Sequence, residues 1–318
     1  MRADRRSLFL HLAVLALLFA LQFVLPAYHH SNLARIMVMA SFAIGYNLLL
    51  GYTGLLSLGH AMFFAAGLYG AGLTLQHLGL DPLSGFLCGL LAGTGLAVAV
   101  GLLALRTSGV AFMIVTLMFA QAGYLTTLYF NEFTRGDEGF VLAAEARRFT
   151  ILGQAIDLGD PATRYNVALL LFAACLLASL ALVRSAIGRV LVAIRENEPR
   201  ALMLGYHSFR YKLLALAISG AMSGAAGAAY ALLFSYVGST FASIQYSIFP
   251  LLWVLVGGVG TVIGPLLGTL VMFYLVDVSS GYTSSYMLVV GLALVLLVLW
   301  FPKGIMGTLR EKRLGWLP

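Results

Sequence analysis

Long uncharged stretches separated by short charged ones are the dominant pattern along this chain. No Asp, Glu, Lys or Arg lies in residues 36–80, 213–276 or 278–302. A helix needs about 20 apolar residues to cross the hydrocarbon core of a bilayer. Because backbone polar groups in lipid must be satisfied within the protein itself, these stretches predict transmembrane helices. The predicted ranges are 8–26, 33–50, 60–78, 83–105, 109–130, 166–183, 213–235, 247–259, 262–277 and 285–301.

The predicted fold class is all-α: a polytopic transmembrane helix bundle with about 8–10 spans, some of them broken by Gly and Pro. The lower number applies if 247–259 and 262–277, which are short, do not each cross the bilayer. The first range has a basic start, as secretion signals do, but its apolar run over 8–25 exceeds the roughly 7–15 residues of such signals. We therefore expect a retained helix and a single transmembrane domain over residues 1–318.

The amino-acid composition excludes several classes of protein. Hydrophobic residues make up 61% of the 318 positions and charged residues only 10%, against about 25% charged in an average soluble domain. These values exclude a disordered chain, a disulfide-rich secreted scaffold and an ordinary soluble enzyme. The two cysteines, Cys88 and Cys175, fall inside predicted spans, and no Cys/His spacing typical of a metal site occurs.

The net charge of +7 indicates how the chain is oriented. Basic residues gather in the N-terminal segment, in 184–212 and in the C-terminal tail, and the loops of membrane proteins that are rich in Lys and Arg face the cytoplasm. The loop 131–165 has six acids and four arginines, and we expect it on the outer side. Topology accounts for the basic bias, so binding to nucleic acid is not needed to explain it.

Two glycine-rich stretches interrupt the predicted helices. Residues 45–60 contain Gly51, Gly54 and Gly59, and 257–265 contain four glycines and a proline. Irregular backbone at membrane depth is tolerated only inside protein or beside a water-filled path. The first stretch predicts a broken helix lining a translocation path, with a tight turn between two helices as the alternative. The second stretch resembles another broken helix. Glycines or alanines every fourth position, at Gly89/Gly93 and over 220–228, predict close helix packing.

The segment 185–212 predicts a short capped helix on the cytoplasmic side. Asn197 can cap the helix N-terminus, Pro199 suits its first turn, and Gly205 can follow its C-terminus. Ala201, Leu202 and Leu204 are then available to a partner protein. The alternative is an amphipathic helix on the lipid surface, with its arginines on anionic head groups.

Several stretches together resemble the permease subunits of branched-chain amino acid ABC transporters, the Liv family, and in particular its M-type subunit. Residues 46–70 resemble the family's signature Asn-Leu-x-x-Gly-x-x-Gly-x-x-Ser-x-Gly-x-x-x-Phe. Residues 188–212 resemble its cytoplasmic loop, and 257–265 with 301–307 resemble its C-terminal Gly-rich and Phe-x-Pro-x-Gly patterns.

The resemblance implies a non-enzymatic transport subunit in the bacterial inner membrane, with both termini in the cytoplasm. It implies a second permease, forming a heterodimer, two ATPase subunits and a periplasmic solute-binding protein as partners. The 185–212 loop would be the coupling loop, and the residues that match the family there are Arg195, Glu196, Asn197, Glu198 and Gly205. No cofactor is expected in this chain, since ATP would be bound by the partner subunits.

The sequence contains no Gly-x-x-x-x-Gly-Lys-[Ser/Thr] phosphate-binding loop, so the energy for transport must come from a partner. Rigid-body rocking of the bundle would alternate access. Candidate residues lining the path are polar or Gly positions in uncharged spans: Asn47, Ser57, Gly59, His60, Thr116, Gln121, Gly257 and Gly260. For His60 the alternative is a hydrogen-bonded packing residue.

Other functions remain as alternatives. The same importer class could carry urea or short amides in place of aliphatic amino acids. An ion-coupled secondary transporter usually needs an intramembrane charge, and only Asp277 lies near a span, where we expect it at the outer end. An intramembrane enzyme would need a catalytic motif such as Gly-x-Ser-x-Gly or His-Glu-x-x-His, and neither occurs. A structural membrane protein is the remaining alternative.

Overall fold

The computed structural model describes residues 2–151 and 154–312. Its α-helices are α1 Arg2–Leu21, α2 Ala27–Asn47, α3 His60–Leu78, α4 Pro82–Ala104, α5 Val110–Tyr129, α6 Asn131–Thr134, α7 Pro161–Arg184, α8 Ala186–Glu196, α9 Glu198–Met203, α10 Ser208–Phe234, α11 Ile244–Gly257, α12 Gly264–Tyr282, α13 Tyr286–Trp300 and α14 Gly304–Lys312. A π-helical turn, Leu48–Tyr52, extends α2, and short 3-10 turns cover Glu145–Arg147 and Ser239–Ala242. The strands are β1 Phe140–Val141, β2 Arg148–Ile151, β3 Gln154–Asp157 and β4 Tyr236–Val237.

The predicted all-α bundle is confirmed. Each of the ten predicted ranges corresponds to one helix: α1, α2, α3, α4, α5, α7, α10, α11, α12 and α13. Within the described residues, six helices are long and apolar enough to cross a membrane, while α11 and α13 have 14 and 15 residues. Some observed helix ends differ from the predicted ones because a capping residue determines where the helix begins. α7, for example, begins at Pro161, five residues before the predicted start, because the Asp160 carboxylate accepts a hydrogen bond from the Thr163 amide at 3.0 Å.

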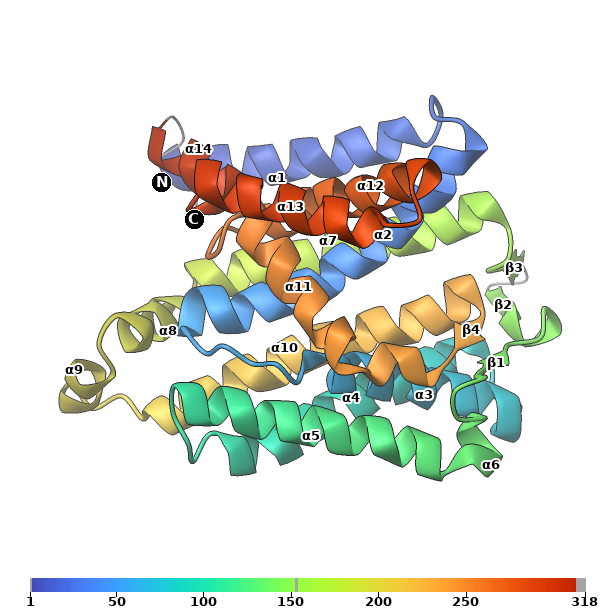
Figure 1. The fold of residues 1–318 in the computed structure, drawn as a ribbon, viewed down its shortest axis with the longest axis horizontal. Coiled ribbons are helices and arrows are strands. Elements are labelled where there is room, and N and C mark those ends of the chain that lie inside the picture. The colour runs from blue at the N-terminus through green and yellow to red at the C-terminus, as the bar shows by residue number, and fades with distance from the viewer. Residues whose placement is uncertain (1, 152–153, 313–318) are drawn as a thin grey trace.

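The bundle has two distinct ends (Figure 1). The start of α1, α14, α8 and α9 lie at one end, and α6 with the β-strands lies at the other. We call these the α9 end and the loop end. The sequence predicted both termini and the 185–212 segment on one side of the membrane and 131–165 on the other, and this arrangement agrees with it. The side chains of Arg2, Asp4 and Arg5 and the whole of Arg313, which belong to the predicted basic termini, lie outside the described residues.

The loop end is partly ordered by β-pairing. β1 pairs with β4 in antiparallel register, Phe140 opposite Val237 and Val141 opposite Tyr236, and β2 pairs with β3. Arg148 donates a hydrogen bond to Asp157 at 2.8 Å, which holds the pKa of that carboxyl below its usual range. The region predicted as the loop 131–165 is therefore tied to the chain after α10, and it ends at residue 160.

The centre of the bundle is built on close helix contacts made by glycine. α10 packs against α3 and α4, and a Cβ added at Gly93 of α4 would lie 2.6 Å from the Gly224 Cα of α10. Such a gap leaves no room for a side chain, so the prediction of small-residue packing is confirmed. In the same helix α4, Gly95 is exposed and a Cβ there meets nothing within 4 Å.

We therefore expect Gly93→Leu to lower the stability of the purified protein by about 3 kcal/mol, the upper end of the usual cost of overpacking. Gly95→Leu, the same change on the outward face of the same helix, should leave the melting temperature in detergent within a degree or two. Equal melting temperatures for the two variants would contradict the packing described above.

Candidate functional site

Both glycine-rich stretches are true interruptions. α2 runs to Asn47, continues as the π-helical turn Leu48–Tyr52 and then gives way to non-helical chain that ends where α3 begins at His60. The second interruption covers 258–263, between α11 and α12. In Figure 1 the first interruption, drawn in blue after α2, turns back from the α9 end into the bundle before α3 begins. α3 therefore starts within the bundle, and its first residue, His60, is fully buried.

The two interruptions meet through the side chain of Asn47. Its Nδ2 donates to the Thr261 carbonyl at 2.9 Å, and its Oδ1 accepts from the Gly260 amide at 2.9 Å. Gly51 also lies directly against Gly260, since a Cβ at Gly51 would be 2.6 Å from the Gly260 nitrogen. Gly260 has φ of +70°, a conformation that favours glycine. We call this contact the Asn47 clamp: Asn47, Gly51, Gly260 and Thr261.

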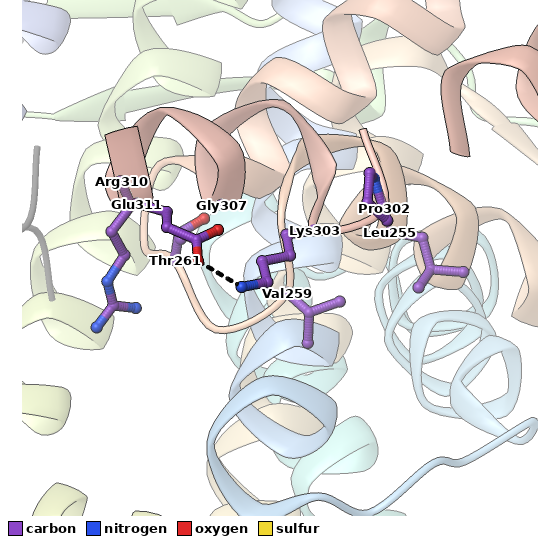
Figure 2. Close-up of a pocket in the computed structure, with 8 residues that line it drawn as sticks. All are labelled: Leu255, Val259, Thr261, Pro302, Lys303, Gly307, Arg310 and Glu311. Atoms are coloured by element: carbon purple, nitrogen blue, oxygen red, sulfur yellow. Dashed lines mark hydrogen bonds and ion pairs between the residues drawn. The ribbon is translucent and has the colours of Figure 1, made fainter. Parts of the chain in front are cut away.

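Two arginines reach the same contact from the α9 end. Arg195, near the end of α8, donates from Nη1 to the Gly51 carbonyl. Arg310 of α14 donates from Nη1 to the Gly260 carbonyl at 3.2 Å. A groove of about 580 Å³ adjoins the second interruption, between the end of α11 and α14 (Figure 2), and an ion pair between Lys303 and Glu311, at 2.8 Å, lies in its wall. Both interruptions are thus bonded to the segments that lie at the α9 end.

The start of α3 is held by three hydroxyls. The Leu58 amide donates to Thr116 Oγ1 at 3.2 Å, the Gly59 amide to Ser57 Oγ at 3.2 Å, and the Ala61 amide to Ser247 Oγ at 3.0 Å. The three hydroxyl-bearing residues are fully buried and come from the interruption itself, from α5 and from α11. They satisfy amide groups that a broken helix leaves without intrahelical partners.

His60 joins three helices. Ser219 Oγ of α10 donates to the Gly45 carbonyl of α2 at 2.6 Å, so the 2.8 Å contact with His60 requires the histidine Nε2 to be the donor. The ring also packs edge-on against Tyr46. This is the geometry of a hydrogen-bonded packing residue, the alternative that the sequence left open.

The predicted path residues therefore fall into separate groups. Asn47 and Gly260 belong to the clamp, while Ser57, Gly59, His60 and Thr116 surround the start of α3. Gln121 lies further along α5 and is partly exposed. Gly257 ends α11 and lies against α12. A Cβ added at Gly257 would be 3.1 Å from the Gly268 amide nitrogen. Three residues of these contacts were not singled out from the sequence: Ser247, Thr261 and, as a residue of the site, Arg310.

The predicted caps of the 185–212 segment are confirmed. Asn197 Oδ1 accepts from the Arg200 amide at 2.9 Å, and Pro199 lies in the first turn of α9. Gly205 has φ of +86°. Its amide donates to the Leu202 carbonyl, and the Tyr206 amide donates to the Ala201 carbonyl. These are the paired hydrogen bonds of a Schellman C-cap. A second helix, α8, precedes α9 and was not expected.

The surface that α9 offers differs from the prediction at one position. Ala201 is only 2% exposed because it packs on Val190 and Ile194 of α8, so it is not available to a partner. Leu202, Met203 and Leu204 are 53%, 87% and 70% exposed. We call these three the α9 apolar tip.

The other predicted coupling residues mostly hold the segment together. Glu198 pairs with Lys212 of α10 at 2.6 Å, which ties α9 to the bundle. Arg195 contacts Gly51 and Glu196, and Asn197 and Gly205 cap α9. The Glu196 side chain is 67% exposed. This segment lines a cleft of about 430 Å³ together with Thr53 and Gly54 of the first interruption.

Comparison with known proteins gives consistent matches over most of the chain. Residues 30–299 match the family described as branched-chain amino acid transport system / permease component. The chain is 30% identical over 299 residues to the high-affinity branched-chain amino acid transport system permease protein LivM of Salmonella typhimurium and to that of Escherichia coli, covering 87% of this chain and 69% of each relative. It is 24% identical over 284 residues to the LivH permease of Salmonella typhimurium, covering 84% of this chain and 91% of that relative. No solved structure matches the chain.

Proposed function

Because this chain belongs to the family of permease components of branched-chain amino acid transport systems, we propose a specific transport role for it. It is a multi-pass membrane protein of the LivM type. In our proposal it forms half of the translocation path of an ABC importer, and the cargo is a branched-chain amino acid. The names of the relatives support this cargo over urea or short amides.

The proposed assembly follows from the two ends of the bundle. A second permease pairs with this chain, as the likeness to both LivM and LivH supports. The α9 end and both chain termini face the bacterial cytoplasm, and two ATPases dock there. A solute-binding protein docks at the loop end, in the periplasm. The basic residues of the 184–212 segment support this orientation in the inner membrane.

One observation carries the proposal: the two interruptions touch each other and are bonded to the segment that would meet the ATPases. Arg195 of α8 holds Gly51, and Asn47 holds Gly260 and Thr261. When ATP binding draws the ATPases together, α8 and α9 move with them, and the Asn47 clamp passes the movement to both interruptions. Alternating access then follows from rocking of the helices that the interruptions join.

The position of Asp277 argues against the ion-coupled alternative. Its carboxylate accepts a hydrogen bond from the Tyr28 hydroxyl at 2.5 Å, where α12 meets the first turn of α2. The start of α2 lies near the loop end in Figure 1. This position supports partner subunits, rather than an intramembrane acid, as the source of energy.

The α9 apolar tip provides a test of ATPase docking. Three large apolar side chains exposed at the C-terminal end of a short helix between charged segments fit a groove on a protein partner. We expect Met203→Ser to reduce the amount of ATPase that co-purifies with the permease by about tenfold, the effect of losing a central interface anchor.

Leu170→Ser is the matched control, because Leu170 is also an exposed apolar residue, on α7 rather than α9. It should leave co-purification unchanged. If Met203→Ser also leaves the ATPase bound at its normal level, α9 rests on the lipid surface and the docking assignment is wrong.

A further inference from the structure

A second groove lies between α3 and α5 in the half of the bundle towards the loop end. Its volume is about 490 Å³, and its walls come from α3, α5, α6, Leu96 of α4 and Ala242. The lining is largely apolar, as Met62, Ala66 and Phe130 illustrate, and contains no charged side chain among the described residues. None of the candidate path residues lines it.

The groove connects the loop end with the start of α3. Thr134 of α6 lines one end, and Met62, in the first turn of α3, lines the other. On α3 the lining runs from Met62 to Leu73, a rise of about 16 Å at 1.5 Å per residue. That is roughly half of a hydrocarbon core of about 30 Å. The groove therefore reaches from the loop end to the level of the bundle at which α3 begins.

The polar groups of the groove are hydroxyls. Tyr69 is 7% exposed and lines the groove, and its hydroxyl lies beside that of Thr127. Thr126, Thr127 and Thr134 line the same space. A small molecule with an aliphatic part and a hydrogen-bonding part matches this lining better than a purely apolar one.

We propose that this groove binds the aliphatic side chain of the amino acid cargo on its way from the loop end to the interruption at α3. The inference rests on the proposed function, which it deepens by placing a cargo site. The acyl chain of a phospholipid is the competing occupant. It would account for the apolar walls, but not for the four hydroxyl-bearing residues among them.

Gly123 of α5 allows the groove to be filled without disturbing the backbone. A Cβ at Gly123 would meet a single atom, Met62 Cβ at 3.6 Å, which is ordinary van der Waals contact. A leucine there extends into the groove. We expect Gly123→Leu to raise the KM for leucine uptake at least tenfold while changing the KM for alanine less than threefold, because the shorter side chain needs less of the space. Gly123→Ala should give a smaller shift in the same direction.

The control is Gly95→Leu, the same substitution on the outward face of neighbouring α4. It should transport both amino acids as the unmodified complex does. An unchanged KM for leucine in Gly123→Leu and Gly123→Ala would overturn the inference. So would an equal loss for leucine and alanine, or a loss of co-purified phospholipid with normal leucine uptake.

The experiment also separates this inference from the proposed function. If the unmodified complex, supplied with its binding protein and ATP, imports neither amino acid, the proposed function fails. If it imports leucine and the Gly123 variants do so with the same KM, only the cargo site is wrong.

Discussion

Replacing Asn47 with leucine is expected to abolish most ATP-driven uptake while the permease still assembles with its ATPases. The substitution keeps the size of the side chain but leaves the Gly260 amide and the Thr261 carbonyl without the two hydrogen bonds that Asn47 makes to them. A buried polar group left without a partner costs about 1–3 kcal/mol. The loss of both bonds should therefore separate the two interruptions and lower uptake by roughly a hundredfold, which corresponds to about 3 kcal/mol.

The measurement is uptake of radiolabelled leucine by vesicles, together with the amount of ATPase that co-purifies. Asn32→Leu is the matched control, since Asn32 lies on the same helix, is partly buried and takes no part in the Asn47 clamp. Uptake by Asn47→Leu within twofold of the control would show that the clamp is not needed for transport.

The second large effect is expected at Arg195. Its guanidinium joins α8 to the Gly51 carbonyl and also pairs with Glu196. A hydrogen bond made by a charged group contributes about 1.5–3 kcal/mol. We expect Arg195→Gln to keep ATP hydrolysis near its normal rate but to reduce the leucine imported per ATP at least tenfold, because α8 would move without pulling on the interruption.

Arg189→Gln is its control. Arg189 belongs to the same helix and is exposed, and its side chain makes no hydrogen bond or ion pair within the described residues. The two variants are compared by the ratio of leucine transported to ATP hydrolysed. A normal ratio in Arg195→Gln would remove Arg195 from the path that couples hydrolysis to transport, and α14 with Arg310 would be the remaining link.

Most of the helical architecture could be predicted from the sequence because it depends on local properties. Uncharged stretches of sufficient length predict spans, and Asn197, Pro199 and Gly205 predict the caps of α9 from the chemistry of single residues. The glycine spacing around Gly93 and over 220–228 predicts close packing in the same way. Each of these signals lies within a few residues of the feature that it specifies.

The contacts of the candidate site could not be predicted, because they join distant parts of the chain. Asn47 was singled out as a polar residue in an uncharged span, but its partners lie more than 200 positions away, and nothing local indicates that its amide would face Gly260 rather than water. Arg195 was assigned to a partner protein, whereas its Nη1 donates to Gly51 inside the chain. The direction of the Arg195 side chain at the end of α8 determines which partner it contacts.

The helix α8 could have been predicted from the sequence. Ile187, Val190, Leu191 and Ile194 follow the spacing of an amphipathic helix, and Ser185 caps its first turn by accepting from the Gly188 amide at 3.2 Å. Recognising α8 would also have indicated that Ala201 is buried, because α9 packs on the apolar face of α8. The π-helical turn Leu48–Tyr52 has no such signal.

The central claim is that this chain is half of an ATP-driven import path for branched-chain amino acids. The most direct test places the complex of this chain, its second permease and its ATPases in proteoliposomes, with leucine-loaded binding protein on the side of the loop end. We predict that leucine accumulates only when ATP is present on the side of α9, and that an uncoupler of proton gradients has no effect. Accumulation driven by an ion gradient without ATP, or none with every component present, would contradict the account.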